Sequence, residues 1–62
     1  MRAAKAVEVR VRVRGVWRVA WSGEHLGASL RDAARGQLDD AEAIAMFEDG
    51  VLTVFEDLRF SY

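Results

Sequence analysis

Apolar and polar positions alternate along the first third of the chain. Between residues 7 and 21 the odd positions carry valine or tryptophan almost without a break, and most even positions carry arginine or glutamate. A period of two is typical of a β-strand with one buried and one solvated face. Gly15 interrupts the alternation, so the pattern predicts a hairpin of two strands, residues 7–14 and 16–21. One long strand bent at Gly15 is the alternative.

The length of the hairpin loop decides which side chains share a face. A two-residue loop at Arg14-Gly15 would turn Trp17 and Trp21 away from the valines of the first strand. A three-residue loop, residues 14–16, places all these large apolar groups on one face, with Val13 opposite Trp17. Because a slip of one residue turns every side chain over, we expect the three-residue loop and place both tryptophans in the core.

A helical period follows the second strand. Apolar residues recur three and four positions apart, as one stripe of an amphipathic helix requires: Leu26, Leu30, Ala33 and Ala34. The stripe predicts a helix over residues 24–35, capped by Ser22 and ended by Gly36. The alternative is a shorter helix capped by Ser29, with Asp32 as the reciprocal partner.

The last third of the chain predicts a second hairpin. Residues 48–50, Glu-Asp-Gly, lie between two apolar runs, which is a strong hairpin signal, although the alanines of residues 41–48 also favour a helix. A three-residue loop with Gly50 in the left-handed conformation pairs Phe47 with Val51. It directs one set of side chains outward: Ala43, Ala45, Phe47, Val51, Thr53 and Phe55.

The order strand, strand, helix, strand, strand predicts a single α+β domain over residues 1–62. We expect a four-stranded, mainly antiparallel sheet with one helix packed across it, an arrangement that resembles the β-grasp. A chain of 62 residues buries only about 60% of its unfolded surface, so association with a second copy or a partner is expected. No apolar run approaches the roughly 20 residues of a membrane span, and we expect a cytoplasmic protein.

Few residues suit catalysis or metal binding. The chain has no cysteine, which excludes disulfides and thiolate metal sites, and His25 is its one histidine. The serines and Thr53 therefore have only His25 as a base. We expect a protein that is not an enzyme and that holds no metal or cofactor.

Charge is unevenly distributed along the chain. Residues 1–31 hold seven Lys/Arg and two Asp/Glu, for +5, and residues 32–62 hold two and eight, for −6. Carboxylates on a small rigid fold can imitate the phosphates of DNA and block a basic groove, whereas the plainer interpretation is that acidic loops keep the protein soluble. The candidate acidic residues are Asp39, Asp40, Glu42, Glu48, Asp49, Glu56 and Asp57.

Two further sets of residues are candidates for binding. An arginine row on the outer sheet face could follow a phosphate backbone, but no aromatic residue is expected among its members to stack on bases: Arg10, Arg12, Arg14 and Arg18. Outward-facing Phe47, Val51 and Phe55 predict an apolar interface, either with a second copy or with a target protein.

A compact, cysteine-free chain of this length, with acidic patterning and no catalytic set, resembles the small phage-encoded anti-CRISPR proteins. The resemblance lies in size, charge layout and simplicity across the whole chain, and it transfers no site residue. It implies an inhibitor in the host cytoplasm that binds a Cas surveillance complex or nuclease and blocks DNA access. A nucleic-acid-binding or autoregulatory module that uses the arginine row is the alternative.

Overall fold

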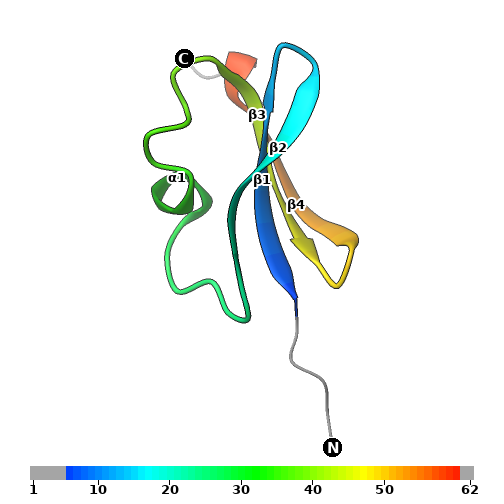
Figure 1. The fold of residues 1–62 in the computed structure, drawn as a ribbon. Helices are drawn as coiled ribbons and strands as arrows, with labels where there is room; N and C mark the ends of the chain where they lie inside the picture. The colour runs from blue at the N-terminus through cyan, green and yellow to red at the C-terminus, as the bar shows by residue number, and fades with distance from the viewer. Residues whose placement is uncertain (1–5, 61–62) are drawn as a thin grey trace, which may run out of the picture.

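The strands form one antiparallel sheet. The computed structural model describes residues 6–60, and these residues form the elements drawn in Figure 1: β1 (Val7–Val13), β2 (Val16–Gly23), α1 (Leu30–Ala33), β3 (Ala41–Glu48), β4 (Val51–Asp57) and a 3-10 turn, η1 (Leu58–Phe60). The strand order is β2-β1-β3-β4, and every neighbouring pair is antiparallel. The predicted four-stranded sheet with one helix is confirmed, as is the choice of a strand for residues 41–48. The likeness to the β-grasp is limited to the order of the elements along the chain, because here β1 and β3 lie side by side at the centre of the sheet and are antiparallel.

The helix is much shorter than the predicted span of residues 24–35. It covers one turn, and the alternative cap is confirmed, because the Ser29 hydroxyl accepts a hydrogen bond of 3.1 Å from the backbone N–H of Asp32. Gly27 disfavours helix by about 1 kcal/mol relative to alanine, which explains why the chain before Ser29 stays irregular. Over residues 6–60, no helix is long and apolar enough to cross a membrane.

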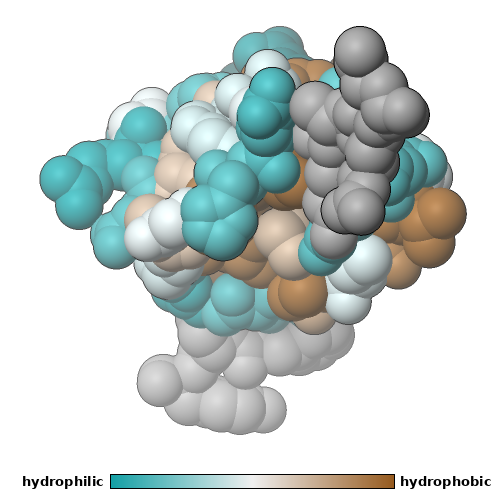
Figure 2. Space-filling model, turned by 90° about the horizontal axis from the view of Figure 1, so that it is seen from below, coloured by the Kyte–Doolittle hydropathy of each residue, from teal (hydrophilic) through white to brown (hydrophobic). Residues whose placement is uncertain are grey.

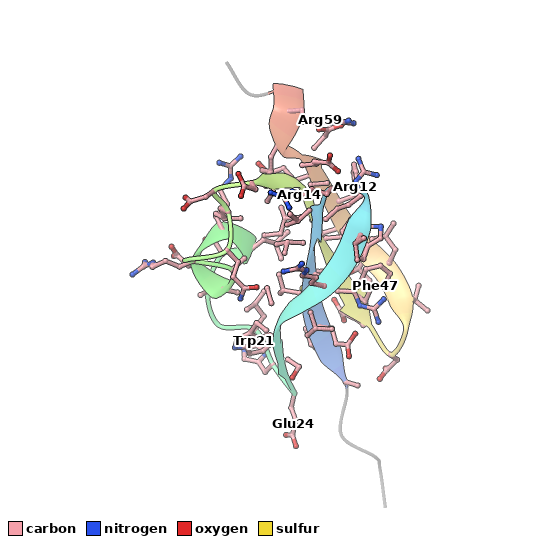
Figure 3. The ribbon with its side chains drawn as sticks, turned by 45° about the horizontal axis from the view of Figure 1, so that its top comes forward. Arg12, Arg14, Trp21, Glu24, Phe47 and Arg59 are labelled. Carbon is pink, nitrogen blue, oxygen red and sulfur yellow. The ribbon has the colours of Figure 1, made fainter. Side chains whose placement is uncertain are left out.

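The core lies between the sheet and the segment that contains α1. Val9 and Val11 of β1, Ile44 of β3 and Ala34 after α1 are fully buried and form its centre. The whole predicted helical stripe reaches this core, although Leu26 does so from a loop. Trp21 packs against the same cluster, on the α1 side of the sheet (Figure 3). We call this side the inner face and the opposite side the outer face.

The first hairpin corrects the predicted loop. Val13 pairs with Val16, so the loop has two residues, Arg14 and Gly15, whose φ angles are 55° and 78°. Two positive φ angles are the mark of a type I′ turn, which matches the twist of the strands better than the longer loop. As a result, Trp17 pairs with Arg12 on the outer face, and its expected place in the core was wrong.

A register shift then reverses the parity of β2. Arg10 pairs with Val19 and Val9 pairs with Trp21, so Ala20 is an extra residue between them. Such a bulge turns the rest of the strand over. The expected inward position of Trp21, opposite Val9, is therefore confirmed even though the loop that led to it was not.

The second hairpin repeats both features. Its loop is Asp49-Gly50, with φ angles of 53° and 82°, and Glu48 pairs with Val51, so the predicted three-residue loop was again wrong. Thr53 is the extra residue, since Phe47 pairs with Leu52 and Met46 with Val54. Leu52 and Val51 consequently exchange the faces that the sequence assigned to them, and Val51 does not lie with Phe47.

Candidate functional site

The outer face of the sheet collects large side chains from all four strands. Register places Arg10 and Arg12 of β1 beside Trp17 of β2, and Phe47 of β3 near Phe55 of β4. We call these five residues the outer-face cluster. The segment with α1 packs on the inner face, as Figure 1 shows, and Phe47 lies on the opposite side of the sheet from Trp21 in Figure 3.

Two alanines form the floor of the outer-face cluster. Ala43 pairs with Arg12 and Ala45 pairs with Arg10, and both alanines are fully buried although they point away from the core. Small side chains on the central strand leave room for long ones from the neighbouring strands to lean inward. The rings of Trp17 and Phe55 consequently meet across the sheet, edge to face, with centroids 6.4 Å apart.

Both arginines of the cluster lie against aromatic rings. The guanidinium carbon of Arg10 is 4.4 Å from the centroid of Phe47, and that of Arg12 is 5.8 Å from the Trp17 ring. These distances are within the range of cation–π attraction, which is worth about 0.5–1 kcal/mol at an exposed site. Each of the two guanidinium groups therefore lies against a ring of the same face.

The cluster remains open to solvent. Trp17 is 38% exposed and Phe55 is 50% exposed. Val19 and Leu52, which pair with Arg10 and Phe47, extend the apolar surface on either side and are also about half exposed. Contiguous exposed apolar surface of this kind marks an interaction site more often than single exposed residues do.

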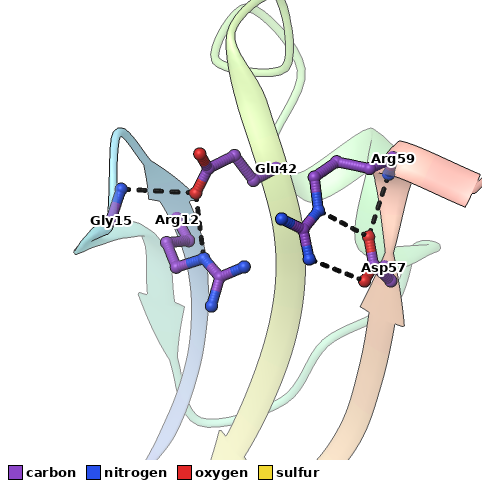
Figure 4. Close-up of polar contacts among 5 residues, drawn as sticks. All are labelled: Arg12, Gly15, Glu42, Asp57 and Arg59. Atoms are coloured by element: carbon purple, nitrogen blue, oxygen red, sulfur yellow. Dashed lines mark hydrogen bonds and ion pairs between the residues drawn. The ribbon is translucent and has the colours of Figure 1, made fainter.

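Carboxylates neutralise the arginines of this face. Glu8 accepts from Nε of Arg10 at 2.9 Å, and Glu42 accepts from Nε of Arg12 at 3.0 Å. The same Glu42 oxygen also accepts from the backbone N–H of Gly15 at 3.2 Å, which ties β3 to the first turn (Figure 4). The outer face is therefore apolar with balanced charge, and not a basic row.

A third ion pair, between Asp57 and Arg59, lies at one end of the outer face. Asp57 accepts hydrogen bonds from the backbone N–H and the guanidinium of Arg59 (Figure 4). The side-chain bond from Arg59, followed by the backbone bond, lowers the pKa of the Asp57 carboxyl below its usual value, and the pKa of Arg59 is raised by the same contact. The charges at this end of β4 are therefore also compensated.

The predicted arginine row is divided between the two faces. Arg10 and Arg12 lie on the outer face as expected, and Arg14 lies in the turn. Arg18 pairs with Val11 and so points to the inner face, which the predicted register had excluded. There it lines an open cavity of about 290 Å³, together with Val11, Val13, Gly36, Gln37, Asp39 and Asp40.

The predicted acidic residues do not form one surface. Glu42 and Asp57 hold arginines at the outer face, and Glu56 pairs with Arg31 of α1, which raises the pKa of that arginine. Asp49 lies in the second turn and accepts from the backbone N–H of Ala6. Asp39 and Asp40 border the cavity on the inner face. Glu48 pairs with Val51 at the start of the second turn.

Sequence reasoning missed Trp17, Val19 and Leu52 as members of the outer surface. The available signal was the dipeptide at each turn, Arg14-Gly15 and Asp49-Gly50, because a glycine in second position between alternating runs favours the two-residue loop. In the part of the chain that the structure describes, no group of three or more His, Cys, Asp or Glu residues is arranged to hold a metal ion. Comparisons with protein-family models, curated proteins and solved structures found no match for this chain.

Proposed function

We propose that this chain is a small, non-catalytic binding protein that docks a protein partner on the outer face of its sheet. The observation that carries the proposal is the pair of half-exposed rings, Trp17 and Phe55, that stand over a floor of buried alanines. Tryptophan and arginine are enriched among the residues that dominate binding energy at protein interfaces. Here both residue types are held in place before a partner arrives, which lowers the ordering cost of binding.

The charge of the face supports a protein partner over a nucleic acid. Phosphate binding draws its affinity from unpaired cations, but Arg10 and Arg12 are each paired with a glutamate. The net charge of the whole chain is −1. A partner suited to this face presents apolar or aromatic side chains to Trp17 and Phe55, with few charges at the centre of the contact.

Nucleic-acid binding stays the second candidate because Trp17 removes an objection to it. The alternation of the first hairpin predicts no aromatic residue among the outer-face arginines, yet Trp17 lies beside Arg12 and Phe47 beneath Arg10. Stacking of bases on such rings is worth about 1–3 kcal/mol per base. The same variants test both candidates.

The resemblance to anti-CRISPR proteins implies a Cas complex as the partner and inhibition as the effect, and both stay predictions. The cytoplasmic location also stays a prediction. The geometry gives DNA mimicry less support than docking on the outer face. Mimicry needs carboxylates that are free to meet a basic groove, but Glu42, Glu56 and Asp57 are already held by arginines. We therefore expect Asp39→Lys/Asp40→Lys to leave target binding unchanged.

The test is affinity capture from a nuclease-treated host lysate with three immobilised proteins. Wild type and Val16→Asp should retain the same partner and Trp17→Asp should lose it. Val16 is the matched control because it neighbours Trp17 and is 57% exposed, but it pairs with Val13 and so belongs to the inner face. Loss of a central tryptophan contact should cost about 2 kcal/mol or more, a decrease in affinity of roughly 30-fold.

Two outcomes would contradict the proposal. Equal capture by Trp17→Asp and wild type would remove the outer face from binding. A gel shift of mixed-sequence single-stranded DNA or RNA at low salt, lost in Trp17→Asp and kept in Val16→Asp, would reassign the face to nucleic acid.

A further inference from the structure

Strand β4 is an edge strand that is open on both of its faces. All residues from Val51 to Phe55 are exposed, with Leu52 and Phe55 on the outer face and Val51 and Val54 on the inner face. Proteins usually protect such an edge with lysine, proline or a short strand, because unpaired backbone groups invite another strand. The sequence of β4 is Val-Leu-Thr-Val-Phe-Glu-Asp, which contains no lysine and no proline. Figure 2 shows apolar surface on the side of the molecule where Figure 1 places the β3–β4 hairpin.

The opposite edge strand, β2, is less suited to pairing with a further strand. Both edge strands contain a bulge, at Ala20 in β2 and at Thr53 in β4, but only β2 carries a cation, Arg18, within it. The side-chain amide of Gln37 also donates to the Ala20 carbonyl at 3.3 Å, which satisfies one acceptor of β2. Of the two edges, β4 is therefore the one that suits a further strand.

We propose that β4 pairs with β4 of a second copy of this chain, antiparallel across a two-fold axis, to form one continuous eight-stranded sheet. Residues directly opposite each other in an antiparallel pair point to the same face. An axis between Thr53 and Val54 meets this condition for the residues on either side of the Thr53 bulge. It places Leu52 opposite the partner's Phe55 on the outer face, and Val51 opposite the partner's Glu56 on the inner face.

This arrangement suits a second copy better than a basic peptide. The carboxylates near the end of β4 are already compensated, since Glu56 is held by Arg31 and Asp57 by Arg59. Each acidic strand end can therefore lie beside the partner's Val51 without an added cation, and a basic peptide would gain little from it. The pairing also joins the two apolar outer patches through Leu52 and Phe55, so the inference goes beyond the proposed function by doubling the docking surface.

The mass in solution gives the first test. Sedimentation equilibrium on wild type at increasing concentration should approach twice the 7.0 kDa of one chain. Val54→Lys, which sets two lysines near the two-fold axis, should abolish the dimer. Val19→Lys should preserve it, because Val19 is a similarly exposed valine on β2. Circular dichroism establishes that each variant is folded.

Two results in this test would overturn the proposal. One is a wild type that stays monomeric at hundreds of micromolar. The other is a dimer that Val19→Lys or Trp17→Asp dissociates and Val54→Lys does not, since the outer faces would then pack on each other.

The register is tested on wild type alone, so a variant that fails to fold does not decide the matter. In a mixed sample of ¹³C-labelled and unlabelled protein, an isotope-filtered NOE experiment should show contacts between the Leu52 methyl groups and the Phe55 ring of different chains. A dimer without this contact would refute the β4 pairing. The edge and the docking face are also separable, because Trp17→Asp should lose the protein partner with its mass unchanged, and Val54→Lys should do the reverse.

Discussion

Replacement of Gly15 by alanine tests the turn that places Trp17 on the outer face. Gly15 has a φ angle of 78°, in the left-handed region that side chains disfavour. An ideal Cβ built on Gly15 meets no atom within 4 Å, so the penalty comes from the backbone alone. The left-handed conformation costs about 1–2 kcal/mol for a residue with a side chain, and we expect Gly15→Ala to lose about 1 kcal/mol of unfolding free energy.

Gly27 provides the matched control. A Cβ at Gly27 also meets open space, but the φ angle of Gly27 lies outside the left-handed region. Gly27→Ala should therefore stabilise the protein by about 0.4–1 kcal/mol through a less flexible unfolded chain. The two variants then differ by about 1.4–2 kcal/mol, and because 1 kcal/mol shifts the Tm of a domain this small by roughly 4–8 °C, their melting temperatures should differ by about 6–16 °C.

Thermal unfolding followed by circular dichroism measures both variants, with urea unfolding as a check on the free energies. A Gly15→Ala protein that melts with wild type would refute the type I′ turn. That result would favour the three-residue loop, in which Gly15 is not left-handed and Trp17 lies in the core.

Three further predictions concern the core, the second tryptophan and the acid limit of stability. Ile44→Val should cost about 0.5–1.5 kcal/mol in urea unfolding, because it removes one methylene from a fully buried side chain; no loss would contradict the burial of β3. Gly23→Ala would set a Cβ 2.9 Å from the Trp21 ring, so it should lower the free energy of unfolding by about 1–3 kcal/mol. It should also change the near-ultraviolet circular dichroism of Trp21, and an unchanged spectrum would contradict that contact. Arg59 lowers the pKa of Asp57 below its usual 3.8, so the pair contributes stability above that pH and loses it as the pH falls through the lowered pKa. Wild type should thus be more stable than Asp57→Asn at neutral pH and should converge with it in acid, and a difference that persists in acid would contradict the assignment.

The strands and the outward arginines could be predicted because alternation is a local property of the sequence. Arg10 and Arg12 lie in a regular stretch of β1, and their outward position follows from the buried valines between them. Phe47 and Phe55 likewise point outward as predicted. Phe47 lies in a regular stretch of β3, and in β4 the shift at Thr53 restores the predicted alternation before Phe55.

The faces of β2 and of the start of β4 could not be predicted by parity alone. If each strand were regular, a three-residue loop would be needed to put every large apolar group of the first hairpin on one face, and this is the loop that the pattern predicts. The protein instead combines a two-residue turn with a bulge in each hairpin, which leaves Trp17 and Leu52 outside. A bulge depends on packing between strands, and little in the sequence around Ala20 or Thr53 predicts one.

The helix shows the same limit from another cause. The apolar stripe correctly identified the side chains that reach the core, including Leu26 and Ala34. It did not identify their backbone conformation, because Gly27 and the Ser29 cap confine the helix to a single turn. Packing required only that the apolar groups face the sheet, and an irregular segment meets that requirement.

The contacts of the Trp17 indole ring test the central claim, that the outer face and not the core holds this residue. A two-dimensional NOE spectrum of wild type should connect the Trp17 ring to the ring protons of Phe55, which lies 6.4 Å away between centroids. The Trp21 ring serves as the internal reference and should show contacts to core side chains. Contacts from Trp17 to Leu30 or Ala34, in place of Phe55, would put it on the inner face and remove the basis of the proposed docking surface.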